Sequence, residues 1–211
     1  MNTFLSQFHI LGSLLLALLV PLPAQGDPAK SIESRLQSAI KKHSIPGLSC
    51  AVMQKGEPTF SKGYGFADLE NDVPATDATV YRLASISKPV TAVLIMQLVE
   101  RGALDLDADV STIVPEWPKK WPVTCRQLLS HLGGVRHYKS TEVESTQRYR
   151  NQVAALPRFA ADPLLHEPGT KYTYSTFGFN LLAAVVEKRH EQSFGAAVRE
   201  HIGRLAHATT L

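Results

Sequence analysis

Cysteine is scarce in this sequence: only Cys50 and Cys125 occur in 211 residues. Two cysteines can form at most one disulfide, so the dense disulfide framework that holds small secreted domains together is excluded. Sequence alone cannot show whether the two thiols meet, because pairing depends on the distance between their Cα atoms. We expect two buried thiols, with a single disulfide as the alternative.

Hydrophobic runs long enough to cross a membrane are also lacking. The apolar stretch at residues 10–20 has about half the length that a bilayer span needs. Two prolines and the small residues 24–26 follow it, as at a signal-peptidase site. We therefore predict a signal peptide at residues 1–26, no stable membrane span in the mature chain, and export to the periplasm or the medium. A buried N-terminal helix is the alternative, whereas a mitochondrial transit peptide is disfavoured because no arginine precedes residue 35.

Clusters of charge and of metal ligands are missing as well. The net charge is +3, and the short basic pairs at residues 41–42 and 119–120 are too small for a nucleic-acid footprint. The eight histidines include no His-x-x-x-His or His-Glu-x-x-His spacing. We expect no nucleic-acid partner, no metal and no cofactor. With 44% hydrophobic and 19% charged residues, the composition is that of an ordinary globular protein.

The hydrophobic periodicity predicts a mixed α/β (α+β) protein. Two apolar stretches separated by a glycine turn, residues 48–53 and 59–66, indicate a β-hairpin. Four segments have helical spacing or helix-start signals, and a polar segment is also expected to be helical. These five are residues 29–42, a helix from about 85–87 to 101, one beginning near 124, 177–189, and the polar segment 141–161.

A serine and a lysine lie three residues apart at the start of one predicted helix. Pro89 is tolerated only in a first helical turn, where its missing N–H has no partner to lose. Because residues i and i+3 share a helix face, the Ser85 hydroxyl and the Lys88 amine can touch. An amine that can take the proton of a neighbouring hydroxyl is a base beside a nucleophile. Ser85 and Lys88 are therefore candidate catalytic residues.

The same spacing also occurs at Ser38 and Lys41, within the polar helix predicted at residues 29–42. Ser-x-x-Lys is short enough to arise by chance in a chain of this length, since both residues are common. We interpret Ser38 and Lys41 as a solvated helix face. What distinguishes Ser85 must therefore lie in its surroundings.

Three stretches together resemble the serine β-lactamase-related family: residues 83–89, 128–135 and 167–178. The family includes class C β-lactamases, D-Ala-D-Ala carboxypeptidases, related esterases and LACTB-type serine proteases. The resemblance implies a β-lactamase/transpeptidase-like fold, with a helical region and an antiparallel sheet. It also implies a serine hydrolase that acts through an acyl-enzyme on an amide or ester. In that reading Ser85 is the acylated nucleophile, Lys88 its base partner and Tyr174 the second proton-transfer residue.

The stretch around Tyr174 departs from the family pattern. The family motif is Tyr-x-Asn, but Thr176 stands where the asparagine is expected and offers a single hydroxyl to a substrate. The literal match, Tyr149 to Asn151, lacks the flanking glycine and apolar run, so we interpret it as surface. His131 lies in the segment that resembles the family's Leu-Leu-x-His-x-Ser-Gly signature, and we expect it to brace loops rather than to catalyse.

The family's Lys- or His-x-Gly strand has no counterpart after Tyr174. We therefore expect residues 27–211 to form a partial domain whose C-terminal strands are missing, leaving an incomplete antiparallel sheet. Two hypotheses remain open. The chain is a serine hydrolase for a small-molecule or peptide acyl substrate, or it is a catalytically inactive, truncated member or binding remnant. The sequence leaves the substrate and the oligomeric state undecided.

Overall fold

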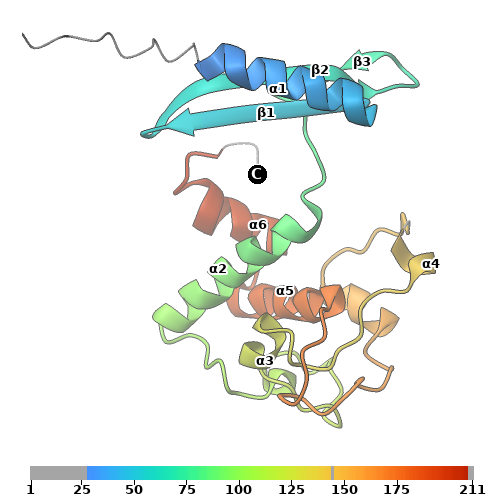
Figure 1. Ribbon diagram of the computed structural model, residues 1–211. Coiled ribbons are helices and arrows are strands. Elements are labelled where there is room, and N and C mark those ends of the chain that lie inside the picture. Colours follow the sequence, from blue (N-terminus) through green and yellow to red (C-terminus); the bar gives the residue numbers. More distant parts are fainter. Residues whose placement is uncertain (1–27, 144, 209–211) are drawn as a thin grey trace, which may run out of the picture. The chain divides into compact units, whose positions relative to one another are not determined.

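The computed structural model describes residues 28–143 and 145–208. They form two compact units, one ending at Tyr81 and the other beginning at Arg82 (Figure 1). The first combines a helix with an antiparallel sheet, and the second is mainly helical. The predicted mixed fold is therefore found. The predicted signal peptide, residues 1–26, lies outside the described residues.

The first unit consists of one helix and a three-stranded sheet. Its elements are α1 (Pro28–His43), β1 (Gly47–Gln54), β2 (Glu57–Asp68) and the short β3 (Val73–Pro74), with strand order β1-β2-β3. Strands β1 and β2 are antiparallel neighbours, which confirms the predicted hairpin. Both turn residues, Lys55 and Gly56, have positive φ, as a tight two-residue hairpin turn requires. Helix α1 lies along the sheet in Figure 1, and its Glu33 pairs with Lys62 of β2.

The second unit has two long α-helices, together with shorter elements. The longer helices are α2 (Ser87–Glu100) and α5 (Thr176–His190), and α6 (Phe194–Val198) packs against both. The shorter elements are η1 (Ala84–Ile86), η2 (Val110–Thr112), α3 (Cys125–Leu129), α4 (Ser140–Val143), η3 (Val153–Arg158) and η4 (Arg199–Gly203).

Helix α5 lies at the centre of the second unit. Ten of its residues are buried, so it is apolar on nearly every side, as expected of a helix surrounded by protein. Helices α2, α3 and α6 all contact it. The fully buried side chains around it include Leu94, Leu98 and Trp117. This packing fixes the position of the α5 N-terminus, which carries part of the candidate site.

Hydrogen-bonding side chains mark the starts of two helices. Thr124 and Gln127 form a reciprocal capping box at α3, where the sequence predicted a helix to begin. Ser175 caps α5 by accepting the Gly178 N–H at 2.8 Å. Each cap satisfies backbone N–H groups that the first turn leaves without a partner.

The prediction for residues 141–161 was wrong. Only α4 and η3 are regular there, and residues 145–152 are irregular. Long-range contacts replace helical ones: Arg136 and Arg158 both pair with Glu142. Ion pairs rather than a buried apolar helix face hold this polar segment, so a helical pattern in its sequence did not predict its structure.

Both cysteines are free; Cys125 is buried and Cys50 is half-buried. Burial raises the pKa of the Cys125 thiol to about 12. The expectation of two unpaired thiols is met, although only one is fully buried.

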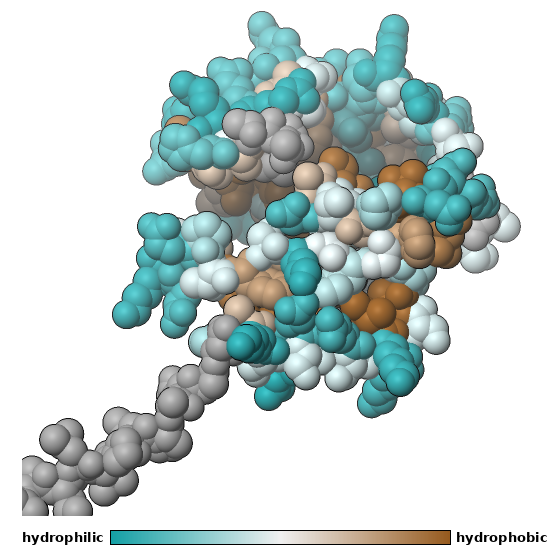
Figure 2. Space-filling view, turned by 90° about the horizontal axis from the view of Figure 1, so that it is seen from above, coloured by the Kyte–Doolittle hydropathy of each residue, from teal (hydrophilic) through white to brown (hydrophobic). Residues whose placement is uncertain are grey.

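Figure 2 shows separate brown, apolar patches among teal, hydrophilic side chains, and Val93 and Met96 of α2 are among the large apolar side chains that remain exposed. Within residues 28–143 and 145–208, no helix is long and apolar enough to span a membrane.

Candidate active site

Ser85, Lys88 and Tyr174 meet within the second unit. The Tyr174 hydroxyl donates to Ser85 Oγ at 2.8 Å, and Lys88 Nζ donates to the same oxygen at 3.3 Å. Ser85 lies in η1 and Lys88 in the first turn of α2, whereas Tyr174 comes from the segment just before α5. Tertiary packing therefore brings a phenol, from a segment distant in sequence, to a hydroxyl and an amine that the helix start already holds together.

The Lys88 amine is buried without an acidic partner. Lys88 is 9% exposed, and no carboxylate in the described part of the chain pairs with it. Its other polar contact is Thr176 Oγ1 at 3.1 Å, and its Nζ lies 4.7 Å from the centre of the Tyr174 ring. The polar neighbours of this amine are therefore the hydroxyls of Ser85 and Thr176 rather than a carboxylate.

Backbone strain marks the residue before Ser85. Ala84 has a φ of 46°, a left-handed conformation that costs about 1–3 kcal/mol for a residue other than glycine. Ala84 is the first residue of η1, which leads directly into α2. The turn presents Ser85 on the surface, where its hydroxyl is accessible.

His131 holds the Tyr174 segment through three contacts. Its carbonyl accepts the Thr173 N–H at 2.8 Å, and its ring Nδ1 accepts the Ser175 N–H at 3.2 Å. The His131 ring lies 4.6 Å from the Tyr174 ring. A left-handed φ of 59° at His131 lets its carbonyl and its ring both reach this segment. The structure thus agrees with the bracing role expected from the sequence.

His137 supports the other side of the same segment, a role that the sequence analysis missed. Its Nδ1 accepts the Thr176 N–H at 3.1 Å, and its ring lies 5.5 Å from Tyr174, edge to face. Because both Nδ1 atoms accept a backbone N–H, both imidazoles carry any proton of the neutral form on Nε2. His131 therefore holds both neighbours of Tyr174, Thr173 and Ser175, and His137 holds the next residue, Thr176.

Three pKa shifts follow from this geometry. The pKa of the Tyr174 phenol is lowered, first by the Lys88 amine and then by the Ser85 hydroxyl. Burial is the main cause that lowers the pKa of both His131 and His137, and the Lys88 charge adds to it. The site therefore makes the Tyr174 phenol more acidic and favours neutral imidazoles behind it.

The two competing sequence matches lie elsewhere. Ser38 is exposed and donates to the Ser34 carbonyl of its own helix, and Lys41 is exposed as well, as predicted for a solvated face. Tyr149 is half-buried rather than fully on the surface, and its hydroxyl donates to Gln147. It takes no part in the contacts around Ser85.

The part of the chain that the structure describes contains no group of three or more His, Cys, Asp or Glu side chains placed to hold a metal ion. The histidines nearest Ser85 use Nδ1 for backbone N–H groups. The chemistry available at this site is therefore that of a hydroxyl, an amine and a phenol.

Comparison with known proteins identifies the fold and its relatives. A family model described as Beta-lactamase matches residues 32–210. The chain belongs to the beta-lactamase family. The human "Serine beta-lactamase-like protein LACTB, mitochondrial" is 33% identical over 76% of this chain, and the match covers 43% of that protein.

Two solved structures extend the family comparison. The hydrolase EstCE1, described as having promiscuous acyltransferase activity, is 25% identical, with a TM-score of 0.72 over 84% of this chain and 51% of its own. The D-amino acid amidase from Ochrobactrum anthropi SV3 is 26% identical, with a TM-score of 0.69 over 82% of this chain and 48% of its own. These likenesses confirm the predicted β-lactamase/transpeptidase-like fold. The chain spans about half the length, or less, of the relatives that it matches.

Proposed function

We propose that this protein is a serine hydrolase that forms an acyl-enzyme at Ser85 on an amide or ester substrate. The proposal rests mainly on one observation: Ser85 Oγ accepts hydrogen bonds from Tyr174 at 2.8 Å and from Lys88 at 3.3 Å. The distance to Tyr174 is within the usual range for direct proton transfer, and the distance to Lys88 is slightly longer. Membership of the beta-lactamase family and the likeness to a hydrolase and an amidase support it.

The proposed reaction begins with attack by Ser85 Oγ on the carbonyl carbon of the substrate. The Ser85 proton passes to the Tyr174 phenolate or to the neutral Lys88 amine, which are the two adjacent bases. That proton then goes to the leaving nitrogen or oxygen as its bond to carbon breaks, and an ester at Ser85 remains. Water attacks the ester, gives its proton to the same base and releases the acid, and Ser85 recovers its proton.

Tyr174 is the better placed of the two bases. Its oxygen is closer to Ser85 Oγ, and its lowered pKa increases the fraction of phenolate at neutral pH. In this account the Lys88 charge stabilises the phenolate, and the buried position of Lys88 keeps water from screening that effect. The Ser85 N–H is the proposed first donor to the oxyanion.

We propose Thr176 as a substrate-binding residue at the edge of this site. Its hydroxyl accepts a hydrogen bond from Lys88 at 3.1 Å and also contributes to lowering the pKa of Tyr174, so a substrate oxygen would compete with the phenol for its proton. A threonine replaces the two donors of an asparagine amide with one. The substrate preference is therefore expected to differ from that of family members with Tyr-x-Asn.

The competing proposal is that this chain is a catalytically inactive family member. The observation in its favour is that Thr176 stands where the family motif has an asparagine. Export by a signal peptide at residues 1–26 is a further proposal, set against the mitochondrial location that the name of the human relative states.

Covalent labelling separates the two functions. The purified chain is incubated with a fluorescent penicillin and with a fluorophosphonate, and the labelled protein is quantified after denaturing electrophoresis. The proposal expects labelling by at least one probe that is lost in Ser85→Ala and retained in Ser38→Ala, the matched serine of the exposed Ser-x-x-Lys. A folded chain that neither probe labels would instead support the inactive alternative.

A further inference from the structure

Arg136 uses every N–H group of its guanidinium. Its Nε donates to Asp162, and its Nη1 donates to the His137 carbonyl at 3.1 Å and to Glu142 at 2.8 Å. Its Nη2 donates to Glu142 at 3.3 Å and to the Arg158 carbonyl at 3.0 Å. An arginine side chain has five N–H donors and no acceptor, so these contacts occupy the whole group. Only 13% of the side chain is exposed. Arg136 therefore has no N–H left for a substrate, and its role must lie in what it holds.

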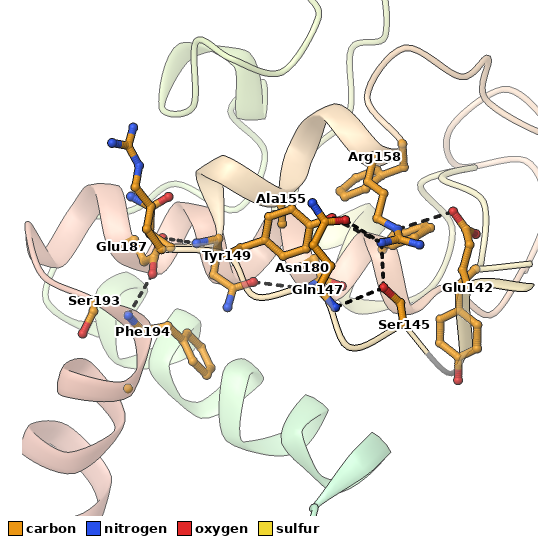
Figure 3. Close-up of a pocket in the computed structure, with 17 residues that line it drawn as sticks. Glu142, Ser145, Gln147, Tyr149, Ala155, Arg158, Asn180, Glu187, Ser193 and Phe194 are labelled. Atoms are coloured by element: carbon orange, nitrogen blue, oxygen red, sulfur yellow. Dashed lines mark hydrogen bonds and ion pairs between the residues drawn. The ribbon is translucent and has the colours of Figure 1, made fainter.

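The main acidic partner of Arg136 is held by further contacts. Glu142 also accepts the Lys139 N–H at 2.7 Å and lies 3.6 Å from Arg158. In Figure 3, which shows a pocket of about 440 Å³ that both residues line, a dashed line joins Glu142 to Arg158. The hydrogen bond from Arg136 is the first cause that lowers the pKa of Glu142 to about 2, and the Lys139 N–H is the second. Glu142 is therefore ionised throughout the neutral pH range, and its pair with Arg136 persists there.

Arg136 contacts the start of α5 through both its backbone and its side chain. Its carbonyl accepts the hydroxyl proton of Ser175, the cap of α5, at 2.9 Å. Its guanidinium carbon lies 4.8 Å from the centre of the Phe177 ring, within the range of a cation–π contact. The adjacent His137 accepts the N–H of Thr176, which lies between those two residues. Two consecutive residues thus hold three consecutive residues at the start of α5.

Tyr174 directly precedes the three residues that are held in this way. Its hydroxyl lies 2.8 Å from Ser85 Oγ, and Lys88 Nζ lies 4.7 Å from the centre of its ring. A shift of residues 175–177 would move the phenol relative to both groups. A displacement of about 1 Å at a reacting group can lower a rate by about 10²-fold, even when the mutation that causes it is distant. The contacts of Arg136 therefore bear on the chemistry at Ser85.

A second arginine of the same unit makes a similar ion pair on the surface. Arg126 donates to both carboxylate oxygens of Asp107, at 2.7 Å and 2.8 Å. The two side chains are 60% and 61% exposed, and an exposed pair contributes little to stability. Its guanidinium contacts Asp107 rather than a residue at the start of α5. The chain thus provides a matched control for the pair of Arg136 and Glu142.

We propose that Arg136 is a positioning residue for the reaction at Ser85, because its side chain and its carbonyl fix the start of α5 and thereby the place of the Tyr174 hydroxyl. The inference rests on the proposed function, since it takes Tyr174 as a base for Ser85. Arg136 acts through Tyr174 and does not touch the reacting atoms. Lysine keeps the charge at this position but has three donors on one atom, so it cannot replace a planar group that serves two carboxylates and two carbonyls.

The first test measures the ionisation of Tyr174 in the full chain by NMR, with ¹³C at the tyrosine Cζ atoms and Tyr174→Phe to assign the signal. The Tyr174 pKa is lowered mainly by the Lys88 amine, so a displaced phenol should regain a value closer to the ordinary one of about 10. We expect this rise in Arg136→Lys. Arg126→Lys should leave the Tyr174 pKa as it is in the unaltered chain.

The second test measures the labelling of Ser85 at a series of probe concentrations. Arg136→Lys should lower the maximal labelling rate by about 10- to 10²-fold, whereas the probe concentration that gives half of that rate should stay within about twofold. The dependence of the rate on pH should move to higher pH together with the Tyr174 pKa. Loss of the fold alone would lower the amount of labelled protein without moving this pH dependence. Arg126→Lys should keep the rate within about twofold, as expected for a surface substitution.

Glu142→Gln provides a second variant, because it removes the charge that faces Arg136 and leaves the arginine in place; Asp107→Asn is its control. Circular dichroism shows which variants are folded, and Glu142→Gln decides the question if Arg136→Lys is not. A Tyr174 pKa that is the same as in the control, or a rise of that pKa without a change in rate, overturns the proposal. The NMR titration needs no reactive serine. A Tyr174 pKa that responds in a chain that no probe labels would therefore overturn the proposed function alone, and normal labelling with an unchanged pKa would overturn the positioning role alone.

Discussion

The chain contains Ser-x-x-Lys in both of its units, and the two copies differ in every contact that matters for chemistry. On α1, Ser38 bonds to its own helix and Lys41 is exposed. At the start of α2, Lys88 is buried and Ser85 meets the Tyr174 hydroxyl. The same spacing thus gives a solvated helix face in one unit and a candidate active site in the other.

The difference arises from what packs against each helix. No residue of α1 is buried, whereas α2 buries Lys88 and several apolar side chains against the core of the second unit. That core includes α5, whose start brings Tyr174 and Thr176 to the amine. A spacing pattern supplies two groups on one helix face; only tertiary packing removes water and adds a third group.

Replacing the two lysines should give the largest contrast. Lys88→Met removes a buried amine that contacts Ser85, and we expect the labelling rate to fall by about 10²–10⁴, the usual contribution of acid–base groups. Lys41→Met, on an exposed helix face, should leave the rate within about twofold. The rates are measured as time courses with the probe that labels the unaltered chain. Equal rates in the two variants would remove Lys88 from the account.

Removing the Tyr174 hydroxyl should have the second-largest effect on the labelling rate. Tyr174→Phe should lower the labelling rate by about 10² or more, because the proton of Ser85 loses its closest acceptor. The rate of the unaltered chain should rise with pH through the lowered Tyr174 pKa, below the ordinary tyrosine value of about 10, and this limb should be missing in Tyr174→Phe. Tyr172→Phe, an exposed neighbour, serves as control. A rise with pH that survives in Tyr174→Phe would assign it to another group.

The histidines behind Tyr174 should make stability depend on pH. Their pKa values are lowered by burial, so between about pH 6.5 and those lower values the unfolded chain binds more protons than the folded one. The contribution of the two histidines to the free energy of unfolding is therefore fully present above this pH window, and it decreases as the pH falls through the window. The Tm should drop between pH 7 and pH 5, and the loss should be smaller in His131→Asn and His137→Asn, whose side-chain oxygens still accept a backbone N–H without titrating.

Asparagine also suits the left-handed backbone of His131. His43→Asn, at the exposed end of α1, is the control and should leave the pH dependence of the Tm as it is in the unaltered chain. If all three variants lose the same amount of stability on acidification as the unaltered chain, the two imidazoles do not titrate in the way described.

The smallest effect on the chemistry is expected at Glu187, which touches none of the groups around Ser85. Glu187→Gln keeps one acceptor but loses a charge-assisted hydrogen bond, worth about 1.5–3 kcal/mol of folding free energy. Glu100→Gln, exposed at the end of α2, should change stability by at most about 0.5 kcal/mol. Denaturant unfolding gives both values. A Glu187→Gln chain as stable as Glu100→Gln would show that the carboxylate does not stabilise the backbone at Gln152 and Phe194.

Local signals in the sequence were sufficient for the elements that depend on local chemistry. The Lys55–Gly56 turn and the alternating strands around it predicted the hairpin, and Pro89 placed the start of α2 within a few residues. Helix α5 was predicted within one residue at each end, because its apolar pattern continues to its last turn.

Residues whose role depends on distant partners were not predictable in the same way. Residues 141–161 are held by ion pairs to Arg136 and by Glu187, so their own periodicity carried no usable signal. His137 was missed because nothing local shows that its ring accepts a backbone N–H from Thr176. One signal was available and unused: Glu187 is an isolated acid within the helix that buries the most residues, and a buried carboxylate requires donors.

The most direct test of the account is the mass of the peptide that contains Ser85 after the chain has reacted with an acylating probe. The account predicts that this peptide gains the mass of the acyl group, and that the gain disappears in Tyr174→Phe and Lys88→Met at short reaction times. An unmodified Ser85 peptide in a folded, labelled chain, with the added mass on another residue, would contradict it.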